Sequence, residues 1–137
     1  MNSIVERFEQ IRWHDSKLLG LSLYRAGGEE QIKLLLELAG EDGRTFPADI
    51  TFLCCSYLAA SVYLDAKRLC ADDIADAECK SSSDWKNSVS KPGPHDPILG
   101  GRHLEGHLHF RISMCPPSGD IDILAKDFAL TSGVSAD

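Results

Sequence analysis

The sequence predicts a single α+β domain built mostly of antiparallel β-strands, about six of them, with a short N-terminal helix. Three observations predict this class. Apolar and polar residues alternate with period two in several segments, short turns containing glycine or proline separate these segments, and a helical pattern of apolar residues opens the chain. The length of 137 residues fits one domain. We place this domain at residues 1–130, followed by a flexible polar tail at residues 131–137.

The N-terminal helix is predicted over residues 3–12. Ser3 stands where an N-cap residue is expected, and Glu6 follows three residues later, as in a capping box. The apolar residues that recur at helical spacing form one face, namely Ile4, Val5, Phe8 and Ile11. We therefore expect this helix to cover a sheet.

The next part of the chain predicts a three-stranded antiparallel meander. A two-residue turn at Gly27-Gly28 fixes the register of the first hairpin, and a loop ending with Gly43 in the left-handed conformation fixes the second. Both turns place apolar residues opposite one another on a single face, in the pairs Leu19–Leu36, Leu21–Leu34, Leu23–Ile32, Leu38–Phe46, Leu36–Ala48, Leu34–Ile50 and Ile32–Phe52. The other face would then carry Leu18, Leu35 and Leu53 among polar groups.

The second half of the chain is less regular. Residues 57–67 fit a strand over more positions than a helix, and residues 72–79 resemble a short helical turn. Residues 80–100, rich in serine and proline, predict an irregular loop in which Trp85 either anchors the loop on the core or awaits a partner. A last hairpin with its turn at residues 117–118 predicts the pairs Met114–Ile121, Ile112–Ile123, Phe110–Ala125, Ser113–Asp122 and His109–Lys126.

Composition limits the partners and the compartment. The net charge of −7 makes nucleic acid an unsuitable partner, because phosphate binding needs the opposite balance. No apolar run approaches the ~20 residues of a membrane-spanning helix, and the first residues lack the pattern of a signal peptide. The five cysteines, an odd number without C-x-x-C spacing, indicate reduced thiols. We expect a cytoplasmic protein that binds neither nucleic acid nor membrane.

Familiar catalytic motifs are missing from the sequence. It contains no G-x-S-x-G, no P-loop, no G-x-G-x-x-G and no H-E-x-x-H, so we expect no cofactor and favour a binding protein over an enzyme. The alternative is a metal-dependent enzyme. Its candidate ligands lie on one predicted strand and point to the same side: His103, Glu105, His107 and His109. Two histidines spaced H-x-H can chelate a divalent metal, and the stretch from Gly101 fits the opening of the cupin motif but lacks its later residues. The other interpretation is a solvated polar face.

Four further residues are candidates for binding: Trp13, His14, Asp15 and Trp85. The neighbours His14 and Asp15 lie at the junction of the helix and the first strand. Such a pair could tune a general base, or Asp15 or Ser16 could satisfy backbone donors at a turn.

The stretch from Trp13-His14-Asp15-Ser16 to Leu21, followed at once by the meander, resembles small bacterial β-rich proteins, among them the type-50 immunity proteins of toxin-immunity loci. The likeness covers about residues 1–55. It implies a cytoplasmic β-rich protein that acts by binding, without a cofactor.

The sequence leaves three functions open. The first is an acidic cytoplasmic binding protein, of the immunity type, that masks a basic protein partner through charge complementarity. The second is a small metal-dependent enzyme that uses the histidine strand. The third is a homo-oligomeric subunit, such as a homodimer, that pairs edge strands or buries Leu18, Leu35 and Leu53 between chains.

Overall fold

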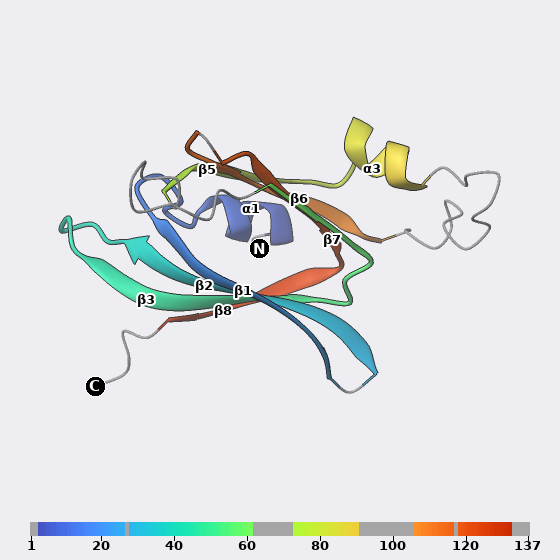
Figure 1. Ribbon diagram of the computed structural model, residues 1–137, viewed down its shortest axis with the longest axis horizontal. Helices are drawn as coiled ribbons and strands as arrows, with labels where there is room; N and C mark the ends of the chain where they lie inside the picture. The colour runs from blue at the N-terminus through green and yellow to red at the C-terminus, as the bar shows by residue number, and fades with distance from the viewer. Residues whose placement is uncertain (1–2, 27, 62–72, 91–105, 117, 133–137) are drawn as a thin grey trace.

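The computed structural model describes residues 3–26, 28–61, 73–90, 106–116 and 118–132. In this part of the chain, eight strands form two antiparallel sheets that lie face to face, with a short helix between them at one side (Figure 1). The expected class, mostly antiparallel strands with a short N-terminal helix, is confirmed, but there are more strands than the expected six. The elements are α1 (Ile4–Glu9), β1 (Lys17–Ala26), β2 (Glu29–Ala39), β3 (Thr45–Leu53), β4 (Tyr57–Ala60), β5 (Ile74–Lys80), α3 (Asp84–Ser90), β6 (Leu108–Met114), β7 (Asp120–Ala125) and β8 (Asp127–Ser132).

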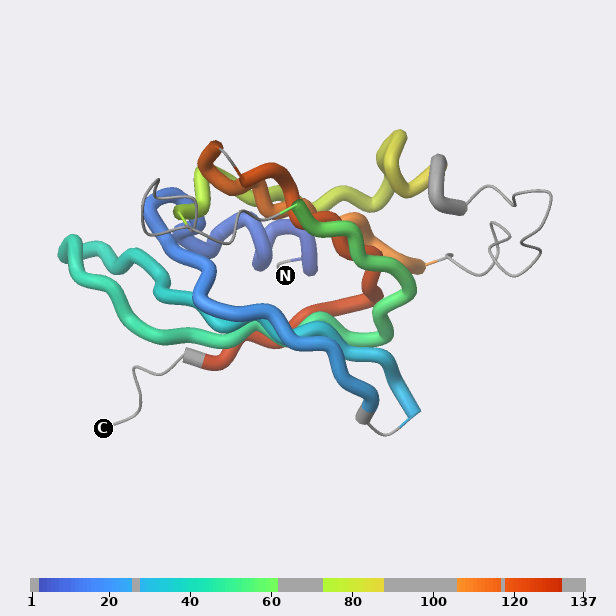
Figure 2. The backbone as a smooth tube through the Cα atoms, in the orientation of Figure 1, coloured from blue at the N-terminus to red at the C-terminus, as the bar shows by residue number. Residues whose placement is uncertain are grey.

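The strand order is β1-β2-β3-β8 in the first sheet and β4-β7-β6-β5 in the second. Two chain segments cross between the sheets at one corner, from β3 to β4 and from β7 to β8 (Figure 2). Backbone hydrogen bonds join these crossings, from Lys126 N–H to Leu53 O at 3.0 Å and from Ser56 N–H to Leu124 O at 2.8 Å. No helix in the described residues is long and apolar enough to span a membrane.

The predicted register of the meander is largely confirmed. Strands β2 and β3 pair in the expected register, from Ile32–Phe52 to Leu38–Phe46. Gly43 has the expected positive φ of 80°. In the first hairpin, Leu21 faces Leu34 and Leu23 faces Ile32 as expected. Alternation and turn chemistry therefore agree wherever the strands run without interruption.

A β-bulge makes the prediction wrong at the start of β1. The register shifts between Leu18 and Gly20, so Leu18, and not Leu19, faces Leu36. One extra residue in a strand reverses the side to which the residues before it point. Leu18 therefore packs against the core instead of lying on the outer face, and Leu19 is 58% exposed.

A second bulge explains why residues 72–79 looked helical. The register of β5 shifts between Ile74 and Asp76, so the inward-facing residues Ile74 and Ala77 are three positions apart. Spacing of three is typical of a helix, but Ile74–Lys80 is a strand paired with β6.

The last hairpin forms, but its predicted register is wrong by two residues. Ile112 faces Ile121, Phe110 faces Ile123 and His109 faces Leu124. The turn is longer than expected: Met114 N–H donates to Gly119 O, and Ser118 N–H to Cys115 O. A shift of two residues keeps every side chain on its expected face, so the apolar pattern alone cannot reveal it.

The remaining segments differ in part from expectation. Of residues 57–67, Tyr57–Ala60 is a strand, and 62–72 lie outside the described residues. The expected loop at 80–100 contains helix α3 up to Ser90, and 91–100 lie outside the described residues. Of the expected tail at 131–137, residues 131 and 132 belong to β8, which pairs with β3, and 133–137 lie outside the described residues.

Helix α1 contributes Phe8 to the hydrophobic core between the sheets. Ser3 caps it as predicted, accepting a hydrogen bond from Glu6 N–H at 3.1 Å. Phe8 is fully buried, and its ring lies 4.8–6.2 Å from four other aromatic rings, those of Trp13, Phe52, Phe110 and Phe128. Phe52 and Phe128 belong to the first sheet and Phe110 to the second, so Phe8 fills the space where the sheets meet.

Polar contacts hold α1 on the strands beside it. Arg7 forms an ion pair with Asp127 of β8 at 3.1 Å, and Glu9 accepts from Cys79 N–H of β5 at 3.4 Å. At the junction of α1 and β1, Ser16 is fully buried; its hydroxyl donates to Arg12 O at 2.6 Å and accepts from Ala39 N–H at 3.0 Å. Ser16 therefore satisfies a backbone donor, but this donor lies at the end of β2 and not in the turn where it was expected.

Phe8→Ala is expected to lower the free energy of unfolding by about 3–5 kcal/mol, because it leaves a cavity between the two sheets. Val5→Ala is the matched control on the same helix; it should cost clearly less, because Val5 is only partly buried. Urea unfolding of both variants measures the difference. Equal losses would contradict a central role for Phe8.

Candidate functional site

A cleft of about 560 Å³ opens at one end of the sandwich. Three regions meet there: the turn from α1 to β1, the loop from β2 to β3, and β5. Two of the predicted binding residues, His14 and Asp15, lie on its wall, and both side chains are about 80% exposed. The structure therefore brings these two residues to a concave surface, as a binding role requires.

The charge of the cleft is mainly negative. Its lining contains the carboxylates of Glu9, Asp15, Glu41 and Asp76 and one guanidinium, that of Arg12. The Arg12 guanidinium donates to Gly40 O at 3.2 Å. Four carboxylates against one cation favour a positively charged ligand.

The backbone at Asp15 is left-handed, with φ 68°, a conformation that aspartate and asparagine tolerate better than most residues. It turns the chain so that His14 reaches β5, where His14 Nδ1 lies 3.1 Å from Ala75 O. Because a carbonyl only accepts, Nδ1 carries a proton. The other ring nitrogen, Nε2, lies 3.6 Å from Asp15 Oδ1. The imidazole is thus held in one orientation at the cleft.

Trp13 has a structural position. It is 3% exposed, its ring packs on Phe8, and its Nε1–H donates to Phe8 O at 2.8 Å. Trp13 also belongs to the lining of the cleft, but almost all of its surface is buried. Trp13 therefore supports His14 and Asp15 from the core.

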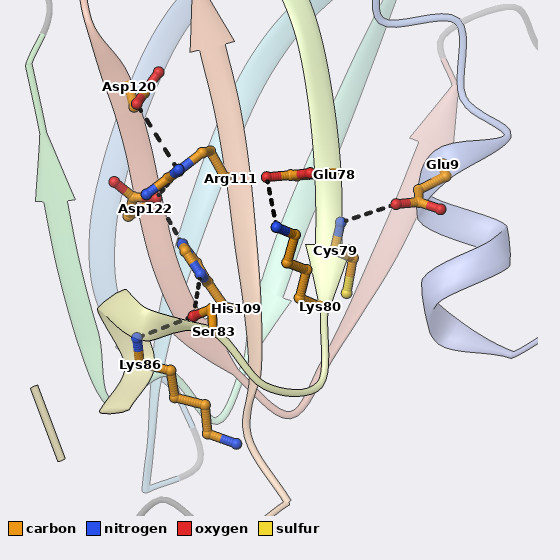
Figure 3. A network of polar contacts seen from close by, with 10 residues as sticks. All are labelled: Glu9, Glu78, Cys79, Lys80, Ser83, Lys86, His109, Arg111, Asp120 and Asp122. Carbon is orange, nitrogen blue, oxygen red and sulfur yellow. Dashed lines mark hydrogen bonds and ion pairs between the residues drawn. The ribbon is translucent and has the colours of Figure 1, made fainter. Parts of the chain in front are cut away.

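A second group of polar residues lies on the outer face of the other sheet, beneath α3 (Figure 3). His109 Nδ1 is 2.7 Å from Ser83 Oγ, and His109 Nε2 is 2.6 Å from Asp122 Oδ1. Arg111 Nε donates to the same carboxylate oxygen at 2.7 Å and lies 3.8 Å from Asp120. Hydrogen bonding and the charge of Asp122 raise the pKa of Arg111. His109 and Asp122 are 3% and 8% exposed, so this is a buried, charged network.

The order of these hydrogen bonds resembles that of a catalytic triad, but the geometry indicates a structural role. In serine hydrolases Nε2 faces the serine and Nδ1 the aspartate, and here the two nitrogens are exchanged. Ser83 also accepts from Lys86 N–H at 3.0 Å, as an N-cap of α3 does. The network therefore holds α3 on the sheet.

Trp85 anchors α3 on the outer face of the sheet. Its ring lies 4.5 Å from that of His109 and 5.5 Å from that of Tyr57. Leu124 lies between these two residues in the sheet and is fully buried. Trp85 thus packs on the outer face of the second sheet and not on the inter-sheet core as one prediction had it, and contact with a partner stays a prediction.

The histidine strand is only partly described. His103 and Glu105 lie outside the described residues. His107 and His109 are 5% and 3% exposed, so a solvated polar face is wrong for these two; His107 Nε2 lies 2.6 Å from Ser56 Oγ. Within the described ranges, no three histidine, cysteine or acidic side chains are close enough to hold a metal ion. Metal binding by the four residues together stays a prediction.

Sequence reasoning named Glu41 and Asp76 within a dispersed acidic set, but it placed none of the following partners beside the residues it selected. Glu9, Glu41 and Asp76 join His14 in the cleft, and Ser83 and Asp122 join His109. Only one of these had a local signal: Ser83 precedes Asp84, as an N-cap residue precedes the acidic first turn of a helix.

The fold and the cleft define an antiparallel two-sheet protein, with a helix wedged between the sheets and an acidic cleft at one end. No family model, curated protein or solved structure matches the chain.

Asp122→Asn is expected to lower the free energy of unfolding by about 1.5–3 kcal/mol, because Asp122 accepts two hydrogen bonds at a buried position. Asp120→Asn, on the same strand, is the control; it should cost about 1 kcal/mol or less, since Asp120 is 45% exposed and 3.8 Å from Arg111. Thermal or urea unfolding compares them. A larger loss for Asp120→Asn would contradict the assigned network.

The buried thiols predict a loss of stability at alkaline pH. Burial raises the pKa of Cys55 and Cys79 from 9.0 to about 12. Above pH 9 the unfolded chain loses these protons while the folded protein keeps them, so stability falls as pH rises from 9 towards 12. Urea midpoints measured across this window should decline less steeply in Cys79→Ala than in the parent. An unchanged slope would contradict the raised pKa.

Proposed function

We propose that this chain is a small acidic binding protein that captures a basic protein partner in the cleft beside His14 and Asp15. The observation that carries the proposal is the excess of carboxylates in that cleft, four against one guanidinium. Lysine or arginine side chains of the partner would replace water beside these carboxylates, and the planar guanidinium of arginine would pair with them in bidentate fashion.

The arrangement of the carboxylates supports binding of a folded partner over binding of a free ion. Glu9 lies on α1, Asp76 on β5, and Glu41 in the loop after β2. Each region is held by its own contacts, such as Glu9 to Cys79 N–H and Asp76 to Ala77 N–H. Fixed charges spread over a concave surface favour an extended basic surface and speed its association.

Two features of the whole chain support a masking role of the immunity type. The net charge of −7 gives the protein a long-range attraction for a cationic partner. The stretch from Trp13 to Leu21, which resembles the type-50 immunity proteins, contains His14 and Asp15 of the cleft wall.

The test compares two variants of equal charge. The cleft variant is Glu9→Gln, Asp15→Asn, Glu41→Gln and Asp76→Asn, in which each amide keeps the size and an acceptor oxygen of the acid it replaces. The control is Glu6→Gln, Glu29→Gln, Asp49→Asn and Asp84→Asn, at positions outside the cleft lining. Each set removes four negative charges.

The probe is an oligoarginine peptide, titrated by calorimetry at low and at physiological salt. We expect the cleft variant to weaken binding at least about tenfold and the control to stay within about threefold of the parent, since a tenfold change corresponds to ~1.4 kcal/mol. Equal weakening in both variants would show attraction to overall charge alone. That result, or no binding by the parent, would refute the cleft as the site.

A further inference from the structure

Strand β1 forms one edge of its sheet, and its apolar side chains are exposed. The described residues provide a pairing partner on one side only, β2, apart from a single bridge between Lys17 and Asp73 at the start of the strand. Leu19, Leu21 and Leu23 are 58%, 37% and 63% exposed. An edge strand of this kind offers unpaired backbone groups beside an apolar stripe, which is a template for strand addition.

The other edges of the two sheets are less suitable for pairing. β4 has four residues, and β5 carries a bulge together with Asp76, Glu78 and Lys80. β8 begins at Asp127, which is paired with Arg7 of α1. β1 is longer, at 10 residues, and Leu18 to Tyr24 contain no ionisable group other than Tyr24.

The charges at the two ends of β1 are already neutralised. Lys17 is 3.0 Å from Asp73, and Arg25 is 2.8 Å from Glu30. Between them lies an uncharged stretch on a protein of net charge −7. Two copies of this protein repel each other unless they approach through such a stretch, whereas a basic partner finds no acidic group there to bind. The charge distribution therefore favours a second copy as the occupant.

We infer that β1 pairs antiparallel with β1 of a second copy, about a two-fold axis at Ser22. In this register Leu21 lies opposite Leu23 of the second copy and Leu23 opposite its Leu21, and Gly20 lies opposite Tyr24. Two leucine pairs form on one face. On the other face the ring of Tyr24 covers Gly20 of the second copy, which has no side chain.

The neighbouring registers are less favourable. An axis at Leu21 would place Lys17 opposite Arg25 of the second copy and would run through the bulge between Leu18 and Gly20. An axis at Leu23 would place Leu21 opposite Arg25. The axis at Ser22 alone uses only the regular part of the strand, Gly20 to Tyr24, and leaves both charged residues outside the pairing.

The result is one continuous sheet through the dimer, in the order β8-β3-β2-β1-β1-β2-β3-β8. Five residues from each copy make a small contact, so the dimer should form at micromolar and not at nanomolar concentration. The cleft lies outside the paired residues, so each copy keeps its acidic surface and the dimer presents two of them.

Sedimentation equilibrium across the micromolar range tests the association. The parent should approach twice the 15.0 kDa of the monomer. Leu23→Lys should weaken the dimer at least about tenfold, whereas Leu130→Lys, which alters an exposed leucine on the other edge strand, should leave it unchanged. Both leucines are exposed, so the melting temperature should stay near that of the parent. A parent that remains monomeric, or equal effects of the two variants, would overturn the inference.

Disulfide cross-linking tests the register. Ser22→Cys places two thiols opposite each other at the axis, within the 4.4–6.8 Å Cα separation that a disulfide spans, so mild oxidation should give a covalent dimer. Tyr24→Cys places them four residues apart along the paired strands, and it should cross-link no more than the parent with its native cysteines. Equal cross-linking in the two variants, or none in Ser22→Cys, would overturn the two-fold at Ser22.

Discussion

The packing of Phe8 between the two sheets is the contact on which the rest of the structure depends. Each sheet has one apolar face, and neither can be buried without the other. At the side where β5 and β8 lie, α1 fills the space, and the rings of Phe52, Phe110 and Phe128 close around its single buried side chain. The same helix leads into the turn that carries His14 and Asp15. Helix α1 and the turn after it therefore contribute residues both to the hydrophobic core and to the cleft.

Sequence reasoning succeeded where local pattern and turn chemistry gave the same answer. The meander was predictable because Gly43 and the alternation of leucines both specify the register that forms. It failed at the bulges in β1 and β5, because one inserted residue breaks the period of two. The glycine at the first bulge, Gly20, is a local sign of a bulge that alternation alone does not use. The shift of the last hairpin was hidden for the opposite reason: a slip of two residues leaves the pattern of faces intact.

Only those residues of the candidate site that are adjacent in the sequence could be predicted together. His14 and Asp15 are neighbours in the chain, so sequence could select them together, but Glu9, Glu41 and Asp76 reach the same cleft from separate elements. The burial of His109 depends on α3, which lies 19 or more residues away along the chain and covers an outer face that would otherwise meet water. Such proximity arises from tertiary packing, which alternation of residue types does not encode.

The ion pair between Arg7 and Asp127 joins residues 120 positions apart, and the ring of Phe128 beside it completes the cluster around Phe8. During synthesis on the ribosome, Trp13 and Phe52 emerge well before Asp127 and Phe128, so the cluster around Phe8 is complete only when β8 has emerged. Contacts of such long sequence separation slow folding, because the chain must close a large loop before any of them forms. Until β8 pairs with β3, the apolar side of α1 is only partly covered, a state in which chaperone binding competes with aggregation.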